Sequence, residues 1–469
     1  MEEVEGRVKM AKINTTAKCH IGTLGEDQLL GILQYLPVKS ILAIGMTCRK
    51  FRELMESEAL WAWICRREWG PSAVQEWLSV GDQKLGWKGI YRQMRILNCV
   101  HCRHLTQTQG GGEAVPSARA SQSLNVVSST LVLFGGGCDG GRHLDDTWTA
   151  PVPDHLADGI RWQQVKSGIP SGRFGQSCTV VGDLLVLFGG INDNGERLND
   201  TWIGQVLYDE TSVGRISWKL LEVATTPARR GAHAGCFAGN NRIVVYGGIG
   251  PDGLRLNDTW MLDLTEGRQP CWQEIETLLS PPPRSGHTLT WIGGNRMVLF
   301  GGRGTHFEVL NDVWMFDMEG NYPEWVELCP YVPNPLDGIP TPRSGHSATP
   351  VFGGRVLIYG GEDASRCRKG DIWIFDPLAG NFVDSPASFT SNADITVPDK
   401  MENSLAHKMW RKLKQKGSPP KERSFHGACA VDSGRSIIIF GGMIDGELQP
   451  AAAVALSFDA ELYLLELVP

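Results

Sequence analysis

A pair of adjacent glycines recurs six times in this chain, each time directly after a short apolar run. The runs read LVLF, LVLF, IVVY, MVLF, VLIY and IIIF, and the pairs after them are Gly135-Gly136, Gly189-Gly190, Gly247-Gly248, Gly301-Gly302, Gly360-Gly361 and Gly441-Gly442. Successive pairs lie 54, 58, 54, 59 and 81 residues apart. A period of about 50 residues indicates a repeat architecture in which each copy folds into the same small unit.

Each copy carries further residues at fixed places. An Arg lies upstream of every glycine pair, and the six are Arg119, Arg173, Arg230, Arg284, Arg343 and Arg423. The third residue after this Arg is Gln122, Gln176, His233, His287, His346 or His426. Asp-x-Trp follows the first five pairs and begins at Asp146, Asp200, Asp258, Asp312 and Asp371; in the sixth copy Glu461 and Tyr463 take these places. A second Trp comes later, at Trp162, Trp218, Trp272, Trp325 and Trp410.

The spacing within a copy leaves room for about four short strands. In the fourth copy they are expected at residues 286–292, 296–300, 312–317 and 325–328, with Pro, Gly and Asn clusters between them. A single sheet of this size leaves its faces uncovered, whereas six sheets stacked radially bury a continuous core between neighbours. The tryptophans supply large apolar area for those contacts. We therefore expect a mostly β fold.

These residues give the region a resemblance to the kelch repeat family. The resemblance covers residues 116–467, about three quarters of the chain. It implies a six-bladed kelch β-propeller, which we expect to occupy residues 99–469. The sixth copy ends with its third strand, at residues 462–467, and would keep an open sheet edge. Residues 99–107 lie just upstream of Arg119, as outer strands do in the other copies, so we expect them to close the ring.

The fifth copy contains an insertion at residues 377–421. Its first half, SPASFTSNADITVPD, is polar, and its second half reads KMENSLAHKMWRKLKQK. The second half has two interpretations. It fits an amphipathic basic helix that acts as a localisation signal or binds an acidic partner. It also fits the outer strand of the copy, around Trp410 and Leu413, and its place in the repeat favours the strand.

Composition excludes several classes of protein. The 469 residues carry a net charge of −7, which gives no global basic field for nucleic acid. The sequence has no apolar run of 18 residues, so we expect no membrane span, and its start lacks the apolar core of a signal peptide. The twelve cysteines are scattered singly, as buried thiols of a reducing compartment are. We expect a nuclear or cytoplasmic protein.

The first 100 residues form a different module. One helical stripe, formed by Leu29, Leu30, Ile32, Leu33 and Leu36, ends at Pro37, and three shorter apolar stretches follow up to Trp69. Short helices of this number make a small core, and domains of this size usually depend on a partner, a metal or disulfides. Because neither metal-ligand spacing nor paired cysteines are present, a protein partner is the economical interpretation.

This segment resembles an F-box. Leu24-Gly25 stands where the family usually opens with Leu-Pro, and Phe51 stands where a Trp is usual. The resemblance implies that a Skp-type adaptor protein binds Leu24, Leu29, Leu30, Ile32, Leu33, Leu36, Pro37, Leu42, Cys48, Phe51, Leu60 and Trp61. We expect a disordered N-terminus at 1–20, the F-box at 21–68 and a helical linker at 69–98. The alternative is a helical cap that packs on the propeller.

The pairing of an F-box with kelch repeats, abundant in plants, implies a substrate-recognition subunit of an SCF-type cullin-RING ubiquitin ligase. Such a protein tethers and orients a target protein, so we expect no catalytic residue, no cofactor and no bound metal. The runner-up is a kelch scaffold without a ligase link. A third interpretation is an enzyme on a kelch-like propeller, of the copper-oxidase or iron-dependent specifier type.

Two sets of residues are candidates for target binding at one end of the propeller. The resemblance places there the repeat arginines Arg119, Arg173, Arg230, Arg284, Arg343 and Arg423, whose alternative role is to bond carbonyls or the Asp of their own blade. The loops after the glycine pairs differ more between copies, and variable loops on a fixed scaffold usually carry specificity. From these loops we select Arg142, Arg197, Arg255, Arg303, His306 and Arg366.

Two other motifs do not support the chemistry that they formally suggest. Cys99-x-x-Cys102 could begin a zinc site, but no matching second pair of ligands follows, and it falls in the expected closing strand. Gly135 to Gly140 matches G-x-G-x-x-G after a strand, but a repeat loop follows it instead of the helix that a dinucleotide site needs.

Overall fold

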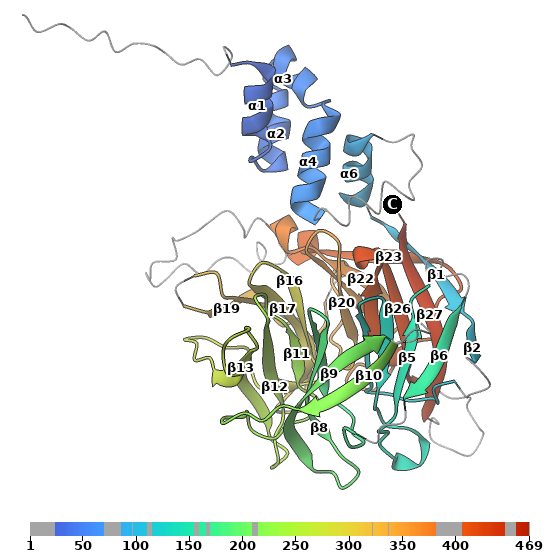
Figure 1. Ribbon diagram of the computed structural model, residues 1–469. Helices are drawn as coiled ribbons and strands as arrows, with labels where there is room; N and C mark the ends of the chain where they lie inside the picture. Colours follow the sequence, from blue (N-terminus) through green and yellow to red (C-terminus); the bar gives the residue numbers. More distant parts are fainter. Residues whose placement is uncertain are drawn as a thin grey trace, which may run out of the picture. The chain divides into compact units, whose positions relative to one another are not determined.

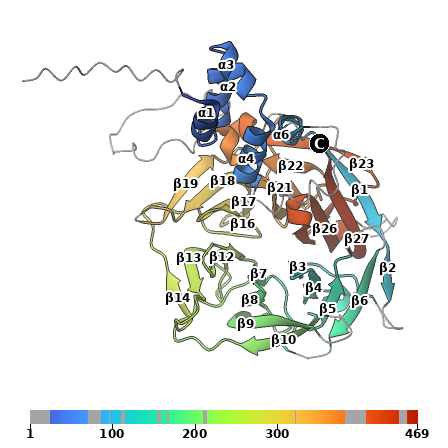
Figure 2. The ribbon, with the colours of Figure 1, turned by 45° about the horizontal axis from the view of Figure 1, so that its top comes forward.

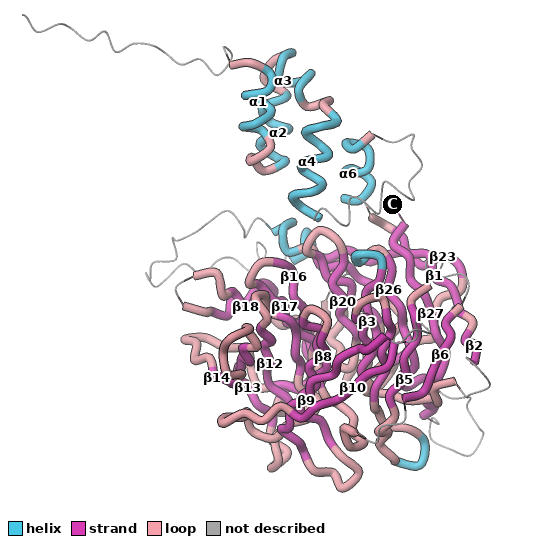
Figure 3. The backbone as a smooth tube through the Cα atoms, in the orientation of Figure 1, coloured by secondary structure: helices cyan, strands magenta, loops and turns pink. Residues whose placement is uncertain are grey.

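The computed structural model describes residues 24–69, 86–95, 97–109, 115–153, 159–165, 169–208, 214–320, 322–335, 337–380, 406–445 and 456–468. These residues divide into two compact units, with the division after Gln93. The first unit is helical, and the second is built of strands (Figures 1 and 3). The expected N-terminal segment 1–20 and most of the expected linker, residues 70–85, lie outside the described residues.

The helical unit contains α1 (Glu26–Leu33), α2 (Val38–Gly45), α3 (Arg49–Leu54), α4 (Glu58–Trp69) and α6 (Trp87–Arg95). Helix α1 begins directly after Gly25, whose backbone N–H donates to the Gln28 side chain at 3.1 Å. Glu26 and Asp27 place negative charge in the first turn, which the helix dipole favours. The absent Leu-Pro opening is thus replaced by a glycine that caps the helix.

The helices bury one compact apolar cluster. It contains Leu29, Leu33, Ile41, Phe51, Leu54, Met55, Leu60, Trp61, Ile64, Cys65 and Tyr91. The Trp61 indole N–H donates to the Met55 carbonyl at 2.7 Å, which satisfies the polar atom of a side chain that is otherwise apolar.

The strand unit consists of antiparallel meanders that follow one another along the chain. Within the described residues, the first is β3 (Ser123–Val127), β4 (Thr130–Phe134), β5 (Thr147–Pro151) and β6 (Ile160–Val165); the second is β7 (Ser177–Val181), β8 (Leu184–Ile191), β9 (Arg197–Tyr208) and β10 (Gly214–Leu220); the third is β11 (Ala234–Phe237), β12 (Arg242–Ile249), β13 (Arg255–Asp263) and β14 (Cys271–Glu274). The fourth consists of β16 (Thr288–Gly293), β17 (Arg296–Gly304), β18 (Val309–Asp317) and β19 (Glu324–Cys329). A short additional strand, β15 (Arg284–Ser285), pairs with β17 beside β16. The predicted strands of this copy are thereby confirmed to within a few residues.

The last two meanders share one nine-stranded sheet. The fifth is β20 (Ser347–Val351), β21 (Arg355–Tyr359), β22 (Ile372–Phe375) and β23 (Trp410–Gly417); the sixth is β25 (Gly427–Val431), β26 (Ser436–Asp445) and β27 (Leu456–Val468), with the short β24 (Arg423–Ser424) beside β26. The basic stretch of the insertion is therefore the outer strand, preceded by a helical turn at 406–409. Residues 381–405 lie outside the described residues.

The sheets lie around a common centre in a β-propeller arrangement (Figure 2). Strand β1 (Cys99–Leu105) pairs antiparallel with β27 over its whole length, and Cys99–Cys102 also pair parallel with Lys414–Gly417 of β23. The next segment, β2 (Gln107–Gln109), pairs parallel with β6 of the first meander. One continuous stretch of 99–109 thus fastens the fifth, sixth and first meanders to one another.

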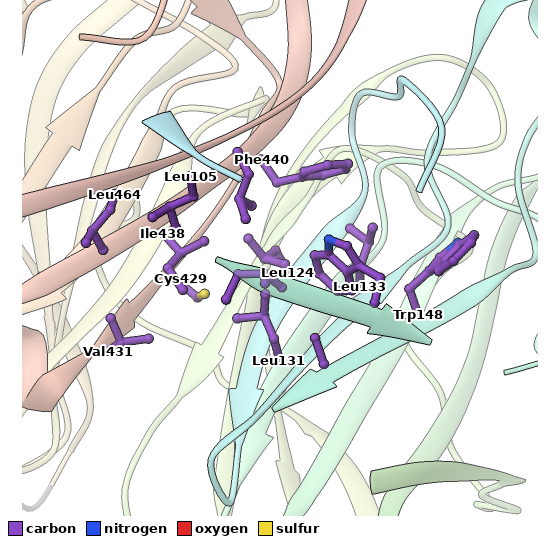
Figure 4. Packing of buried hydrophobic residues seen from close by; sticks show 14 residues of the cluster. Leu105, Leu124, Leu131, Leu133, Trp148, Cys429, Val431, Ile438, Phe440 and Leu464 are labelled. Atoms are coloured by element: carbon purple, nitrogen blue, oxygen red, sulfur yellow. The ribbon is translucent and has the colours of Figure 1, made fainter. Parts of the chain in front are cut away.

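Neighbouring sheets pack through the outer tryptophans. In five of the six copies the aromatic residue before the glycine pair contacts the outer Trp of the next copy, with ring centroids 4.8 to 6.1 Å apart; the pairs are Phe134–Trp218, Phe188–Trp272, Tyr246–Trp325, Phe300–Trp410 and Phe440–Trp162. Figure 4 shows the contact between the last and first meanders, where Leu105 of β1 joins Phe440, Ile438, Leu133 and Trp148. The tryptophans therefore lie at the sheet contacts, as predicted.

Candidate partner-binding sites

The helical unit leaves four large apolar side chains exposed on and beside α1 and α2. Ile32 is 41% exposed, Tyr35 73%, Leu42 42% and Met46 79%. Tyr35 and Met46 lie just after the ends of α1 and α2, three and four residues after Ile32 and Leu42 respectively. We call these four residues the exposed apolar set. Their exposure is unfavourable in water, so they are candidates for a contact with another protein.

The predicted adaptor-binding residues separate into three groups. Leu29, Leu33, Phe51, Leu60 and Trp61 are buried and form the core of the unit. Leu24, Leu30 and Leu36 are half-buried against that core. Ile32, Pro37, Leu42 and Cys48 are exposed. The sequence prediction missed Tyr35 and Met46, although both follow an exposed apolar residue at helical spacing.

The six repeat arginines are not on the surface. All have 0% exposure, so the prediction that their side chains contact a target is wrong, and their alternative structural role holds. Arg284 illustrates the pattern: its guanidinium donates to both Asp312 carboxylate oxygens at 2.8 and 2.7 Å, and to the carbonyls of Gly301 and Pro282 at 3.0 Å each. The Trp314 indole N–H donates to the same carboxylate at 2.8 Å. The planar fork of an Arg suits this bidentate contact.

The same Arg–Asp–Trp contact recurs in the first five copies. The Arg–Asp pairs are Arg119–Asp146, Arg173–Asp200, Arg230–Asp258, Arg284–Asp312 and Arg343–Asp371. Burial alone would raise the pKa of Asp200, Asp258 and Asp371, but the paired guanidinium and the Trp N–H outweigh it and hold each pKa below its usual value. These carboxylates are thus fixed as anions within the blade.

The sixth copy uses a different acid from the one the sequence suggested. Asp459, two residues before Glu461, pairs with Arg423 at 2.6 Å. Glu461 instead contacts His104 of β1, and the Arg423 guanidinium lies 5.0 Å from the Tyr463 ring centroid. The acid therefore shifts along β27 while the aromatic residue keeps its place.

A ring of backbone hydrogen bonds closes the propeller at the axis. The residue two after each repeat Arg donates its N–H to the same residue of the preceding copy, at 2.6 to 3.1 Å, and the ring runs through Ser121, Gly175, Ala232, Gly286, Gly345 and Phe425 back to Ser121. All six residues have φ between 53° and 65°. We call this the axial ring. It gives the end that carries the glycine pairs a rigid centre.

Below the axial ring lies a central cavity of about 450 Å³, lined by the first strands of all six copies. The His or Gln of each copy faces it, and three of the histidines bond a hydroxyl of the preceding copy: His233 to Ser177 at 2.9 Å, His346 to Thr288 at 2.9 Å and His426 to Ser347 at 2.8 Å. Burial and the charge of Arg230 lower the pKa of His233 to about 3. These histidines are neutral parts of the framework.

The loops after the glycine pairs surround the axial ring and form, with the loops before the repeat arginines, a surface that we call the glycine-pair end. Arg142, His306 and Arg366 are exposed there, whereas Arg197, Arg255 and Arg303 are half-buried. Arg255 lies over the Phe307 ring at 4.6 Å, and Arg303 approaches Glu362 at 3.6 Å. This surface therefore combines exposed cations with an aromatic residue that the sequence prediction had not selected.

Comparisons with known proteins agree with this geometry. Residues 24–67 match the F-box-like family, and residues 88–277 and 210–392 match the KLHDC2/KLHL20/DRC7 Kelch-repeats domain. The chain is 46% identical to the F-box/kelch-repeat protein At1g51550 of Arabidopsis thaliana, over 95% of this chain and 92% of that protein. The chain belongs to the F-box/kelch-repeat family. It is also 31% identical to Adagio protein 3 of Arabidopsis thaliana over 90% of this chain, and there it spans 62% of the relative's length.

The family assignment shows to which domain each of the two surfaces belongs. Residues 24–67 of the helical unit are the F-box, and the exposed apolar set lies on them; the glycine-pair end belongs to the kelch propeller. No helix among the described residues is both long and apolar enough to cross a membrane. The Cys-x-x-Cys of residues 99–102 lies on β1, where burial raises the pKa of the Cys102 thiol to about 11. All eleven cysteines in the described ranges are free thiols.

Proposed function

We propose that this protein is the substrate-recognition subunit of an SCF-type cullin-RING ubiquitin ligase. The F-box binds a Skp-type adaptor through the exposed apolar set, and the kelch propeller binds a target protein at its glycine-pair end. The protein makes no bond itself: it holds the target at a set distance from a ubiquitin-transferring enzyme and so raises the local concentration. Such a complex works in the cytoplasm or the nucleus.

The observation that carries the proposal is the exposure of Ile32, Tyr35, Leu42 and Met46 within a segment that matches an F-box. Burying a fully exposed Leu, Ile or Met side chain contributes about 1.5–3 kcal/mol, and Ile32 and Leu42, which are 41% and 42% exposed, would gain a correspondingly smaller share. Such burial is a larger fraction of the total stability of a small helical unit than of a large domain, because the core of the small unit contributes less.

Co-elution of the purified full chain with a purified Skp-type adaptor tests the proposal. The wild-type chain should elute as a complex, and Ile32→Glu combined with Leu42→Glu should abolish co-elution while the chain stays folded. The matched control is Leu207→Glu, which also places a charge at an exposed apolar position, 49% exposed, but on β9 of the propeller. No binding by the wild type would favour a kelch scaffold without a ligase link. Equal co-elution of all three proteins would show that the adaptor binds a surface other than the exposed apolar set.

A further inference from the structure

Five loops of the glycine-pair end form the same tight turn. In each, the N–H of the fourth residue donates to the carbonyl of the first at 2.9 to 3.2 Å, and the turns are 138–141, 192–195, 250–253, 304–307 and 363–366. The fourth residue has a left-handed backbone in all five, with φ between 61° and 81°. The first three copies place Gly141, Gly195 and Gly253 there, but the fourth and fifth place Phe307 and Arg366.

The axial ring also contains one large side chain, and it lies next to the fifth copy. Five of its positions hold glycine, serine or alanine, whereas the sixth copy holds Phe425 with a φ of 55°. The Phe425 ring lies against Gly345 of the fifth copy, where an added Cβ would come within 2.7 Å of the ring. Phe425 is half-buried and lies next to Ser424, whose hydroxyl donates to Glu362 at 3.2 Å.

A left-handed backbone is unfavourable for side chains other than glycine, because the Cβ crowds the following carbonyl. The equivalent copies show that glycine or a small residue satisfies the same turn and the same ring. Phe307, Arg366 and Phe425 therefore retain a conformational cost that the fold itself does not require. Residues of this kind cluster at functional sites, where the side chain that they display justifies the strain.

The contacts around these three residues are continuous from the third copy to the sixth. Arg255 lies over the Phe307 ring, the Phe307 carbonyl accepts from Arg303 at 3.4 Å, and Glu362 lies between Arg303 at 3.6 Å and Arg368 at 3.7 Å. Arg368 also donates to Asp445 at 2.9 Å. The surface is partly apolar as well, since Phe307 is 67% exposed and Leu254 of the neighbouring loop is 66% exposed.

Two cations of this part of the surface form no ion pair among the described residues. Within the described residues, neither Arg255 nor Arg366 makes an ion pair, and the only side-chain hydrogen bond of Arg255 goes to the Ser285 hydroxyl at 3.3 Å. Burial and the nearby Arg303 charge lower the pKa of Arg255, and Glu308 offsets this only in part. A carboxylate brought by a partner would compensate both guanidiniums and form the charge-assisted bonds that they lack.

We propose that the sector formed by Phe307, Arg366 and Phe425 binds an extended segment of the target in which an apolar side chain lies next to Asp or Glu. The apolar side chain packs on Phe307 or Phe425, and the carboxylate accepts hydrogen bonds from Arg255 or Arg366. The inference rests on the proposed role of the propeller in target capture, and it names the part of the propeller and the chemistry of the segment.

Fluorescence anisotropy with the full chain tests it, with pools of labelled 15-residue peptides as probes. The first pool places Leu or Phe beside Asp or Glu; the second replaces the acids by Asn and Gln; the third replaces the apolar residues by Ser; the fourth replaces the acids by phosphoserine. The first pool should bind at least about tenfold more tightly than the second and third. Preference for the phosphoserine pool over the first would overturn the assignment to carboxylate side chains.

The decisive variants are Phe307→Gly and Phe425→Gly, which remove the side chain and relieve the backbone. Each should weaken binding of the first pool by about tenfold and leave the Tm unchanged or higher. Arg366→Gly should behave in the same way. The matched control is Gly195→Phe, which introduces a left-handed Phe at the equivalent turn of the second copy; it should lower the Tm and leave binding unchanged.

Binding is measured well below the lowest Tm, with folding of each variant verified by circular dichroism, so a loss of binding reports the surface. The inference is overturned if Phe307→Gly and Phe425→Gly bind the first pool as the wild type does, or if the wild type binds no pool. It is also overturned if light scattering shows a dimer of the wild type that becomes a monomer in Phe307→Gly, because a second copy of the chain would then cover this surface. Adaptor co-elution of the same samples separates this inference from the proposed ligase role, because each readout can fail while the other holds.

Discussion

The F-box and the propeller treat their apolar side chains differently. Strands β4 and β21 are buried at every residue, because each sheet of the ring has a neighbouring sheet against either face. The F-box has a core of its own, yet Ile32, Tyr35, Leu42 and Met46 remain exposed within one short segment. A closed repeat supplies its own partners, since each copy covers the next. A single small bundle has no second copy, and its remaining apolar surface is available to a different protein.

The first prediction concerns a buried ion pair that stabilises the propeller from within. Arg284→Ala should lower the free energy of unfolding of the propeller by about 3–5 kcal/mol, because it leaves the Asp312 carboxylate, only 4% exposed, without its partner. Chemical denaturation of the full chain, followed by tryptophan fluorescence, measures the change. Arg268→Ala is the control, since Arg268 is 73% exposed and its pair with Asp263 should contribute less than about 1 kcal/mol. Equal effects would contradict the structural role of the repeat arginines.

The second prediction opens the contact that the N-terminal strand makes. Leu105→Ala on β1 should cost about 2–4 kcal/mol, because Leu105 fills the core between the sixth and first meanders. Thermal denaturation of the full chain gives the Tm, and Leu220→Ala at a 44% exposed site of β10 is the control. A Tm that falls no further for Leu105→Ala than for the control would mean that β1 does not stabilise the closure of the propeller.

The third prediction concerns pH. His233 and His346 have a folded pKa of about 3 because burial, and then the charge of the neighbouring repeat Arg, disfavours protonation. The unfolded chain binds these protons near pH 6.5, so the stabilisation is complete above pH 6.5 and is lost as the pH falls from there toward 3. The double variant His233→Gln, His346→Gln copies the Gln122 and Gln176 of the first two copies.

In this double variant the Tm should decline less steeply between pH 6.5 and 4.5, because unfolding no longer takes up the protons of these two histidines. His306→Gln, at an exposed loop position, should leave the decline as in the wild type. An unchanged slope in the double variant would show that the cavity histidines do not couple folding to pH.

The smallest predicted effect comes from adding a hydroxyl that one cavity histidine lacks. Among the described residues, buried His287 makes no hydrogen bond to a hydroxyl of the preceding copy, because Ala234 stands where Ser177, Thr288 and Ser347 offer hydroxyls to the other histidines. Ala234→Ser should therefore stabilise the propeller by about 0.5–1.5 kcal/mol. Ala348→Ser, on the first strand of the fifth copy, is the control. A Tm at or below the wild-type value would contradict this account of the cavity.

Most of the propeller was predictable from the sequence because its determinants recur. The glycine pairs, the Trp positions and the strand pattern of each copy are local and repeated, and β1 pairs with β27 where an outer strand was missing. The acid of the sixth copy is an exception: spacing from Tyr463 selects Glu461, whereas the carboxylate that reaches Arg423 belongs to Asp459, two residues earlier on β27.

The binding surfaces were harder to predict, for two physical reasons. Amphipathic stripes show which F-box residues are apolar but not which of them the bundle covers, so Leu29 and Trp61 were grouped with exposed Ile32, and Tyr35 and Met46 were missed. The resemblance places the loop of the repeat arginines at the target-facing end, whereas the burial of their side chains depends on how the blades close. Phe307 and Phe425 stand out only through their backbone conformation, which a sequence does not display.

Calorimetry of the full chain with and without a saturating Skp-type adaptor tests the central claim, that the F-box needs a foreign partner and the propeller does not. We expect two transitions, of which the one from the F-box rises on adaptor addition, by about 2.7 kcal/mol of stabilisation at 100 times the Kd, while the propeller transition stays in place. A wild-type chain whose F-box transition ignores the adaptor, or whose propeller transition rises with it, would contradict the account.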